Sequence, residues 1–504
     1  MIDMSLLGID IGSSSCKGVA FTVDGIELAR ASASYCPVTV GSSVEIETTV
    51  FREAVFNVIL ALTGQLSNDL VEALAISSHG ETVIAIDKNG NATGPAIMNA
   101  DNRAEEEAAW WEKTFGREEI YKITGLPLHP MFSLNKVMWI RKHRPELYAI
   151  TNKFVSVSDY VLTQLGFPPY TDYSLACRTM AFDIHNRCWS QKILEHCGIP
   201  IEKLGIPLAA GTVVGKLSAE IASTLGLREG IVVALGGHDQ PCGALGAGAI
   251  RSGDVVDSAG TYECLTAVSQ TPMNSNKSLG YSLNSYCHVV PGKFVTLAFF
   301  PAGMVSAWFT KQFYCEEKKI EQESKKDLHT MLDENTMSFC PGPSGLCTTP
   351  HFAGSGTPYW DARATGVMAG FTPDTTIYHL YKGIFEGIAC ELAINISVLE
   401  EIIGPFGSMN ISGGNSRSRF TVQLRADMTR KQINLLVNDE TVCLGAAVLA
   451  GIAAGKYEDA EEAVEKVVRV KETILPDHQS QLAYEKQFDR YKLLYKSLGR
   501  FREV

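Results

Sequence analysis

The chain has 504 residues, 45% of them hydrophobic and 20% charged, so it can bury large cores and a long disordered region is not expected. At roughly 150 residues per domain, this length predicts two large domains or three smaller ones. Acidic residues outnumber lysine and arginine by 56 to 44, and the net charge of −12 argues against a nucleic-acid-binding protein, which needs a positive excess.

The sequence shows no sign of secretion, membrane insertion or a cysteine-based metal site. Its N-terminus lacks a basic region and carries acidic residues within the apolar run. The longest uncharged apolar stretch, residues 294–310, spans 17 residues, whereas a membrane-spanning helix needs about 20. None of the 13 cysteines forms a Cys-x-x-Cys pair, so free thiols are expected. We therefore expect a soluble, cytoplasmic protein.

Strands alternate with helices along the first half of the chain. Residues 6–11 and 17–23 are predicted as the two strands of a hairpin, joined by a turn at Gly12–Ser15. A helix over 50–66 follows, with buried strands over 73–78, 82–86 and 231–235. This alternation indicates the α/β class.

The second half contains a similar hairpin. An apolar strand at 254–259, a small-residue turn at Gly260-Thr261 and a second strand at 262–268 have the same order as the first hairpin. Two such hairpins favour a duplicated α/β unit with a cleft between the copies. Helices are predicted over 378–399 and 419–428, with a charged helical tail from 459.

The two hairpin turns are candidate phosphate sites. Small residues let a phosphate approach several backbone N–H groups closely, and Gly12–Ser15 and Gly260-Thr261 both provide such turns. Asp10, at the end of the preceding strand, could hold Mg²⁺ through water. Each turn alone also fits an ordinary glycine hairpin, but both together favour phosphate binding.

Two other phosphate-binding motifs are absent. Gly211–Lys216 has its glycines four residues apart instead of five, and Leu217 replaces the Ser or Thr of a P-loop. Gly243, Gly246 and Gly248 do not match the dinucleotide-binding order and are expected to let a helix pack closely against a strand instead. Residues 444–451 are likewise predicted as a tightly packed, buried helix.

Asp239 is the strongest candidate for chemistry. It follows the core strand at 231–235, at the start of a predicted helix, where side chains point into the ligand crevice of an α/β sheet. A carboxylate there can accept a proton from a substrate hydroxyl during phosphoryl transfer, or it can cap the helix. These two interpretations carry equal weight, and His238 is expected to be packed or hydrogen-bonded.

Two polar clusters after short strands, residues 78–81 and 101–103, suit a polyhydroxyl ligand, which needs many hydrogen bonds, although surface loops explain each cluster equally well. The glycines of residues 412–418 precede a helix and could let the backbone lie against an adenine ring or a phosphate. As an isolated glycine pair, this is a weak signal.

Taken together and in order, five segments resemble the FGGY family of carbohydrate kinases, and its xylulokinase-like members in particular. They are Gly8-Ile-Asp-Ile-Gly-Ser-Ser-Ser15, Ser78-His-Gly80 with Asp101-Asn-Arg103, Gly236-Gly-His-Asp-Gln240, Gly354-Ser-Gly-Thr-Pro-Tyr-Trp-Asp361, and Ser412-Gly-Gly414 with Leu444-Gly-Ala-Ala447. They span nearly the whole chain, so the joint match is far more specific than any one segment.

The resemblance implies the actin-like ATPase fold, a duplicated ribonuclease-H-like architecture with ATP and a small sugar meeting in the cleft. Residues 1–249 would form the sugar-binding domain and residues 250–504 the nucleotide-binding domain, with the helical tail from about 459. Dimers are common among similar proteins, so a homodimer is also implied, although no surface in the sequence identifies an interface.

The resemblance also implies roles for individual residues. Asp239 would be the catalytic base and Asp10 would lie near Mg²⁺. The phosphates of ATP would be held by Gly12, Ser13, Ser14, Ser15, Gly260 and Thr261, and the adenosine by Gly303, Gly413, Gly414 and Ser418. The sugar pocket would be lined by His79, Gly80, Glu81, Asp101 and Gln240.

The sugar itself stays open. Gly80 stands where glycerol kinases carry an arginine, which disfavours glycerol, whereas His79-Gly80 matches xylulokinases. The pair His238-Asp239 is similar to kinases of deoxy-ketohexoses such as fuculose, and gluconate is a further alternative. Outside this class, an actin-like ATP-binding protein without transfer activity would keep the hairpins but needs no base. An NAD-dependent oxidoreductase is disfavoured, because the dinucleotide-binding glycine motif is missing after the first strand.

Overall fold

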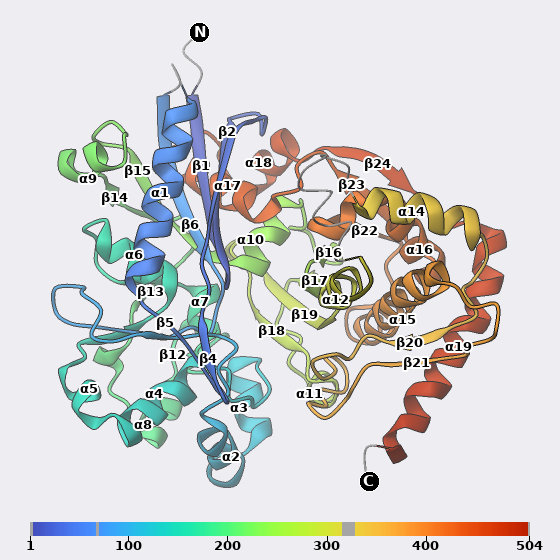
Figure 1. The fold of residues 1–504 in the computed structure, drawn as a ribbon. Helices are drawn as coiled ribbons and strands as arrows, with labels where there is room; N and C mark the ends of the chain where they lie inside the picture. Colours follow the sequence, from blue (N-terminus) through green and yellow to red (C-terminus); the bar gives the residue numbers. More distant parts are fainter. Residues whose placement is uncertain (1–3, 67–69, 315–327, 502–504) are drawn as a thin grey trace.

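Two mixed β-sheets, one in each half of the chain, form the framework of the molecule (Figure 1). The computed structural model describes residues 4–66, 70–314 and 328–501. The first sheet has the strand order β14-β15-β6-β1-β2-β3. Its strands are β1 (Met4–Ile11), β2 (Ser15–Thr22), β3 (Glu27–Ser34), β6 (Leu70–Ser78), β14 (Val213–Lys216) and β15 (Val232–His238).

The second sheet repeats this topology. Its strand order is β18-β19-β17-β16-β22-β23-β24. In each sheet an antiparallel meander (β1-β2-β3, or β16-β17-β19) is extended by two parallel strands, β6 and β15 or β22 and β23. The predicted duplication is therefore confirmed. The strands are β16 (Val255–Ala259), β17 (Tyr262–Ser269), β18 (Asn284–Cys287), β19 (Phe294–Pro301), β22 (Ser408–Ser412), β23 (Gln432–Leu436) and β24 (Val470–Ile474).

Helices cover both faces of each sheet. The long helix α15 (Ile377–Ile403), predicted from its apolar spacing, shares the large core of the second sheet with α16 (Arg419–Thr429). Helix α1 (Thr49–Gln65) packs on one face of the first sheet. The other helices are α2 (Glu105–Thr114), α3 (Arg117–Thr124), α4 (Ser133–His143), α5 (Pro145–Ile150), α6 (Val157–Gln164), α7 (Tyr173–Cys177), α8 (Gln191–Cys197), α9 (Ala219–Thr224), α10 (Asp239–Gly246), α11 (Asn276–Gly280), α12 (Gly303–Phe313), α14 (Leu328–Phe339), α17 (Thr441–Ala453), α18 (Ala460–Val467) and α19 (His478–Phe501), with 3-10 turns η1 (Ile201–Lys203) and η2 (Gly414–Arg417).

Short strands support the loops around the sheets. They are β4 (Val38–Val40), β5 (Ser43–Ile46), β7 (Ile84–Ile86), β8 (Ala96–Ile97), β9 (Lys153–Val155), β10 (Tyr170–Asp172), β11 (Phe182–Asp183), β12 (Cys188–Trp189), β13 (Ile206–Leu208), β20 (Cys347–Thr349) and β21 (Val367–Ala369). Among the residues that the structure describes, no helix is both long enough and apolar enough to cross a membrane. All the cysteines described there are free thiols.

Helices α10 and α17 lie between the two sheets (Figure 1), and their backbones approach each other closely at glycine positions. A Cβ atom added at Gly445 of α17 would fall 1.9 Å from the carbonyl oxygen of Cys242 in α10. One added at Gly246 of α10 would fall 1.9 Å from the Thr441 carbonyl oxygen, and one at Gly8 of β1 would fall 1.8 Å from that of Cys443. Residues 444–451 are tightly packed, as predicted, whereas Gly246 approaches helix α17 instead of the strand that was expected.

The charged C-terminal segment is not helical throughout. Helices α18 and α19 flank β24 (Val470–Ile474), which pairs antiparallel with β23 at the edge of the second sheet. Three of its five residues are exposed and two are charged, as is common for edge strands, so their pattern lacks the apolar alternation by which buried strands are recognised. The expectation of a purely helical tail missed this strand.

Candidate active site

Three neighbouring parallel strands of the first sheet end at the same level. Ile11 of β1 pairs with Ser78 of β6, and Ser78 pairs with His238 of β15. The residues at these strand ends, Asp10 and Asp239 among them, therefore emerge together at the carboxyl edge of the sheet. That edge is the usual ligand position in open α/β sheets.

Asp239 is the first residue of α10 and follows β15 directly. The N-cap position belongs to His238, so Asp239 is not the N-cap residue. The Asp239 Oδ1 atom is buried and makes no hydrogen bond, and His238 Nε2 lies 3.1 Å from it. Burial, with the neighbouring carboxyl groups of Asp10 and Glu81, raises the pKa of Asp239 well above its usual range. The next residue, Gln240, also has a buried and unpartnered side-chain oxygen, Oε1.

Asp10 has the features of a cation ligand. Its Oδ1 atom is buried without a hydrogen-bond partner, and burial raises its pKa to about 7 despite the opposing effect of Lys17. Carboxylate oxygens are the ligands that Mg²⁺ prefers, so this end of β1 fits a divalent cation. The adjacent turn at Gly12–Ser15 leaves Ser13 and Ser14 exposed, and the Gly12 amide donates to the Ser15 carbonyl oxygen at 2.9 Å.

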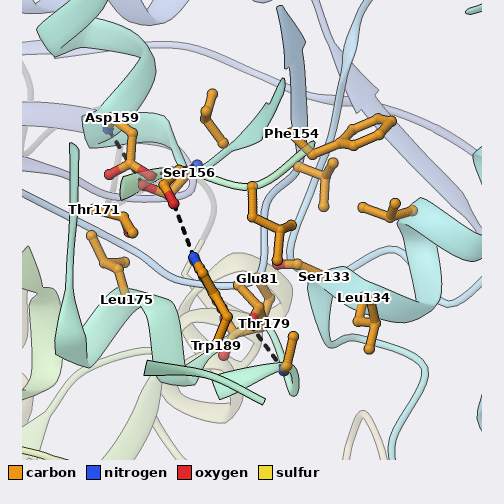
Figure 2. Close-up of a pocket in the computed structure, with 16 residues that line it drawn as sticks. Glu81, Ser133, Leu134, Phe154, Ser156, Asp159, Thr171, Leu175, Thr179 and Trp189 are labelled. Carbon is orange, nitrogen blue, oxygen red and sulfur yellow. Dashed lines mark hydrogen bonds between the residues drawn. The ribbon is translucent and has the colours of Figure 1, made fainter. Parts of the chain in front are cut away.

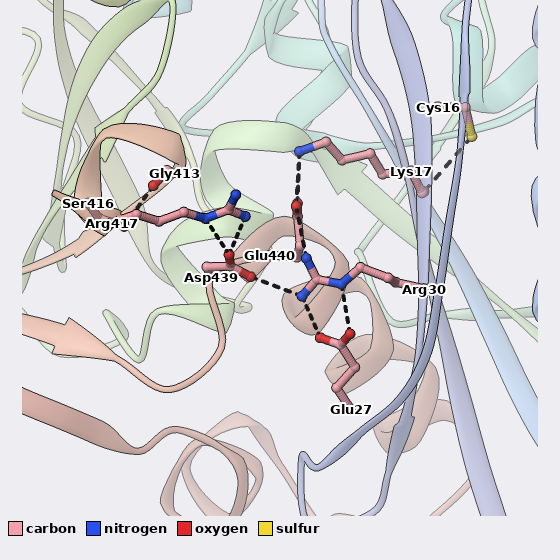
Figure 3. A network of polar contacts seen from close by, with 9 residues as sticks. All are labelled: Cys16, Lys17, Glu27, Arg30, Gly413, Ser416, Arg417, Asp439 and Glu440. Carbon is pink, nitrogen blue, oxygen red and sulfur yellow. Dashed lines mark hydrogen bonds and ion pairs between the residues drawn. The ribbon is translucent and has the colours of Figure 1, made fainter. Parts of the chain in front are cut away.

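An ionic network joins the first hairpin to the second half of the chain (Figure 3). Lys17 Nζ on β2 lies 2.9 Å from the Glu440 carboxylate. Arg30 on β3 lies 3.1 Å from Asp439, and Arg417 Nε donates to the same carboxylate at 3.0 Å. The sequence analysis did not identify this network, because its members are separated by about 400 positions in the chain.

Two residues expected in the sugar pocket use their polar atoms within the protein. His79 Nδ1 lies 2.9 Å from the Ile11 carbonyl oxygen, and its Nε2 lies 2.7 Å from the Thr82 hydroxyl. The fully buried Asp101 carboxylate accepts from the Arg103 side chain and from the Val44 amide at 2.6 Å. Both side chains therefore support the strand-end loops from within.

Glu81 instead pairs with an arginine that sequence reasoning missed. Arg178, which follows α7, places Nε and NH2 each 2.5 Å from Glu81 Oε1. Glu81 has a φ of 61°, a strained conformation for a residue other than glycine and one that clusters at functional sites. A Cβ atom at Gly80 would fall 2.8 Å from Arg178 Cγ, so the glycine leaves room for this arginine.

Glu81 also lines a small pocket in the first half of the chain (Figure 2). Figure 2 shows Ser156 and Asp159 on one wall and Phe154 on another. The Asp159 carboxylate accepts from the Ser156 amide at 3.0 Å in a capping box at the start of α6. Trp189 Nε1 donates to the Gly205 carbonyl oxygen at 3.0 Å. These polar groups are paired locally, which is typical of structural packing.

The second sheet carries a larger pocket at the end of β16. The expected nucleotide residues Gly260, Thr261, Gly303, Gly414 and Ser418 all line it. Gly413 lies beside it with a φ of 89°, and a Cβ atom there would fall 2.8 Å from the Ala259 carbonyl oxygen.

This pocket also contains residues that the sequence analysis missed. Asp333 of α14 lines it, accepting from the Ser418 hydroxyl at 2.6 Å and from the Tyr381 hydroxyl at 3.0 Å. Asn415 and Arg417 line it from η2. No short sequence motif joins these residues, and only the folded chain brings α14, α15 and η2 together.

Gly303→Ala is expected to weaken nucleotide binding about tenfold, because the added Cβ would lie 2.5 Å from the Gly260 carbonyl oxygen and displace the turn at Gly260-Thr261, the candidate phosphate site. A calorimetric titration of the protein with ATP measures the change in affinity. Gly280→Ala is the matched control, since no atom lies within 4 Å of its added Cβ. Equal affinities in the two variants would contradict the assignment of this turn to the nucleotide.

Comparison with known proteins covers almost the whole chain. Residues 5–246 match the N-terminal domain of the FGGY family of carbohydrate kinases, and residues 255–454 match its C-terminal domain. A gluconokinase of Bacillus subtilis is 28% identical over 90% of this chain and 88% of the relative. A xylulose kinase of Staphylococcus epidermidis is 28% identical over 98% of this chain and 97% of the relative.

Solved structures of sugar kinases share the fold. The ligand-bound xylulose kinase of Lactobacillus acidophilus has a TM-score of 0.88 at 23% identity, covering 98% of both chains. The glycerol kinase of Plasmodium falciparum with ADP has a TM-score of 0.84 at 19% identity, again covering 98% of both chains. The expected actin-like architecture is confirmed.

Proposed function

Since this chain belongs to the FGGY family of carbohydrate kinases and is an ATP-dependent sugar kinase, we propose that Asp239 is the general base of the transfer reaction. The observation that carries this proposal is the set of buried side-chain oxygens on Asp239, Gln240 and Asp10 that make no hydrogen bond, with His238 Nε2 lying 3.1 Å from the Asp239 oxygen. Buried polar atoms are normally paired, so such a set at one sheet edge points to a polar ligand.

In the proposed reaction, the Asp239 carboxylate accepts the proton of a sugar hydroxyl while the hydroxyl oxygen attacks the γ-phosphorus of ATP. The bond from that phosphorus to the β,γ-bridging oxygen breaks, giving a phosphosugar and ADP. Gln240 Oε1 would accept from a second sugar hydroxyl. Positioning and charge neutralisation supply most of the catalysis in such transfers.

The nucleotide is proposed to lie in the pocket of the second sheet, with its phosphates directed at both hairpin turns. Gly260 and Thr261 would hold the phosphates from one side and Gly12–Ser15 from the other. Asp10 would hold Mg²⁺, which when bound offsets the negative charge of the phosphates. In this proposal the domain boundary lies near residue 250, with the sugar on the first domain and ATP on the second.

We propose a small ketose, such as a ketopentose of the xylulose type, as the acceptor. The match between His79-Gly80 and xylulokinases and the similarity to named xylulose kinases support this choice. The named gluconokinase relative supports gluconate as the second candidate. Deoxy-ketohexoses of the fuculose type are a third, suggested by the His238-Asp239 pair.

An ADP-release screen with Mg·ATP tests this function. The acceptors are ketopentoses, ketohexoses, deoxysugars, polyols and sugar acids, and the phosphosugar is verified by mass. We expect one acceptor class to stimulate ADP release well above the rate with ATP alone. Tight ATP binding without stimulation by any acceptor would contradict the proposal and support an ATP-binding protein without transfer activity.

A further inference from the structure

We propose that Arg178 contacts the sugar directly and that its pairing with Glu81 selects a neutral polyhydroxyl sugar over a sugar acid. This inference rests on the proposed kinase function and deepens it by naming the acceptor class. Its premise is a buried ion pair beside the proposed base.

Arg178 lies close to the residue that precedes the proposed base. A single point, the place of a Cβ atom on Gly80, lies 2.8 Å from Arg178 Cγ and 3.1 Å from His238 Cδ2. Arg178 and the residue that precedes Asp239 therefore both border the space beside Gly80. His238 Nδ1 in turn lies 2.9 Å from the Tyr286 hydroxyl, and the Arg178 guanidinium lies over the Tyr286 ring at 4.8 Å.

The Arg178 guanidinium has hydrogen-bond donors that its protein partners do not use. A guanidinium carries five N–H donors. The contacts between Arg178 and the described residues use Nε and NH2 toward Glu81, and NH1 toward Asn284 Oδ1 at 3.2 Å. Two N–H groups remain for a ligand. A polyhydroxyl sugar offers acceptor oxygens close to the hydroxyl that faces Asp239.

The charges of the groups around Arg178 and Glu81 disfavour a negatively charged substrate. The side chains of Arg178 and Glu81 are 7% and 5% exposed, and their opposite charges offset each other. The other carboxyl groups nearby, those of Asp10 and Asp239, are negative when ionised. Lys136 is fully buried and donates to the carbonyl oxygens of Glu81 and Met98. Burial lowers its pKa to about 7, so it is a weak counter-charge. A substrate carboxylate would enter a site without a free cation among these groups, at a high desolvation cost.

The test compares neutral ketoses with sugar acids of the same chain length. D-xylulose and D-ribulose are measured against D-xylonate, and D-fructose and L-fuculose against D-gluconate, as kcat/KM at saturating Mg·ATP. We expect the best neutral sugar to exceed every sugar acid by about 100-fold or more, because a buried carboxylate without a counter-charge is costly to desolvate. A sugar acid as the best acceptor would overturn the inference while leaving the kinase function intact. Phosphorylation of neither class would instead overturn the proposed function.

Variants then test the two residues. Glu81→Gln frees the charge of Arg178, so the ratio of kcat/KM for gluconate to that for the best ketose should rise about tenfold or more. Arg178→Met should lower kcat/KM for the ketose about 100-fold, but it leaves Glu81 buried and unpaired, which can unfold the protein.

The double variant Arg178→Met with Glu81→Gln removes both charges and avoids this problem. It should retain the thermal stability and ATP affinity of the wild type, yet keep the low activity toward the ketose. Arg228→Met is the matched control, because Arg228 lies away from the site and forms an ion pair with Glu72 at a distance of 3.0 Å. Wild-type kcat/KM in the double variant would overturn the contact between Arg178 and the sugar, and an unchanged acid-to-ketose ratio in Glu81→Gln would overturn the charge argument.

Discussion

Asp239→Asn is expected to lower kcat at least about 1000-fold, because asparagine cannot accept the proton of the attacking hydroxyl. The substitution keeps the size of the side chain and replaces only a carboxylate oxygen, so α10 and its packing should be preserved. The measurement is sugar-dependent ADP release, with the phosphosugar quantified in a single-turnover reaction. KM for ATP should change little, because Asp239 faces the sugar in the proposed site.

The control for this variant separates catalysis from folding. Asp183→Asn makes the same chemical change at the end of β11, where Asp183 accepts from the backbone amides of His185 and Asn186 in the exposed turn that follows. It should retain nearly full activity. Both variants should bind ATP and melt at temperatures close to that of the wild type. A kcat of Asp239→Asn within a few-fold of the wild-type value would show that another group takes the proton.

Gly445→Ala is expected to destabilise the protein by about 3 kcal/mol or more, because its Cβ would lie 1.9 Å from the Cys242 carbonyl oxygen. Backbone atoms of α10 cannot move aside as a flexible side chain can, so the two helices must separate. Since α10 begins with Asp239, activity should fall together with stability. Thermal unfolding followed by circular dichroism gives the stability, and initial rates well below the melting temperature give the activity.

Gly64→Ala is the control for a glycine without a close neighbour. Gly64 lies within α1, no atom lies within 4 Å of its added Cβ, and alanine is the better helix former. This variant should melt at or above the wild-type temperature. If Gly445→Ala also melts there, the close approach of α10 and α17 is not important for stability.

Much of the fold could be predicted because each half of the chain carries its own local signals. The hairpin turns at Gly12–Ser15 and Gly260-Thr261, and the apolar spacing of α15, are patterns within short windows. Strand β24 lacks such a pattern, because an exposed edge strand needs no apolar face. The order of the strands within each sheet depends on long-range pairing, and its signs in the sequence were the similarity between the two hairpins and the resemblance to a known family.

The site was predicted less completely, because a sequence does not show which polar atoms are already paired. His79 and Asp101 are polar residues at strand ends, as expected, but Thr82, Ile11, Arg103 and Val44 occupy their hydrogen-bonding atoms. Arg178, which pairs with Glu81, and Asp333, which lines the pocket of the second sheet, come from distant segments that carry no motif. Such residues can be found only by long-range contacts, here over 97 positions for Arg178 and Glu81.

The alignment of Ile11, Ser78 and His238 limits how this enzyme can change its substrate in evolution or by design. Because successive strand residues face opposite sides of a sheet, deleting or inserting one residue in β1, β6 or β15 would move Asp10, Ser78 or Asp239, respectively, by about 3.3 Å and reverse the side it faces. Loops that begin after these strand ends have no such restriction. New acceptor specificity should therefore arise through exchange of loops, such as the segment that carries Arg178, while the lengths of the three strands stay constant.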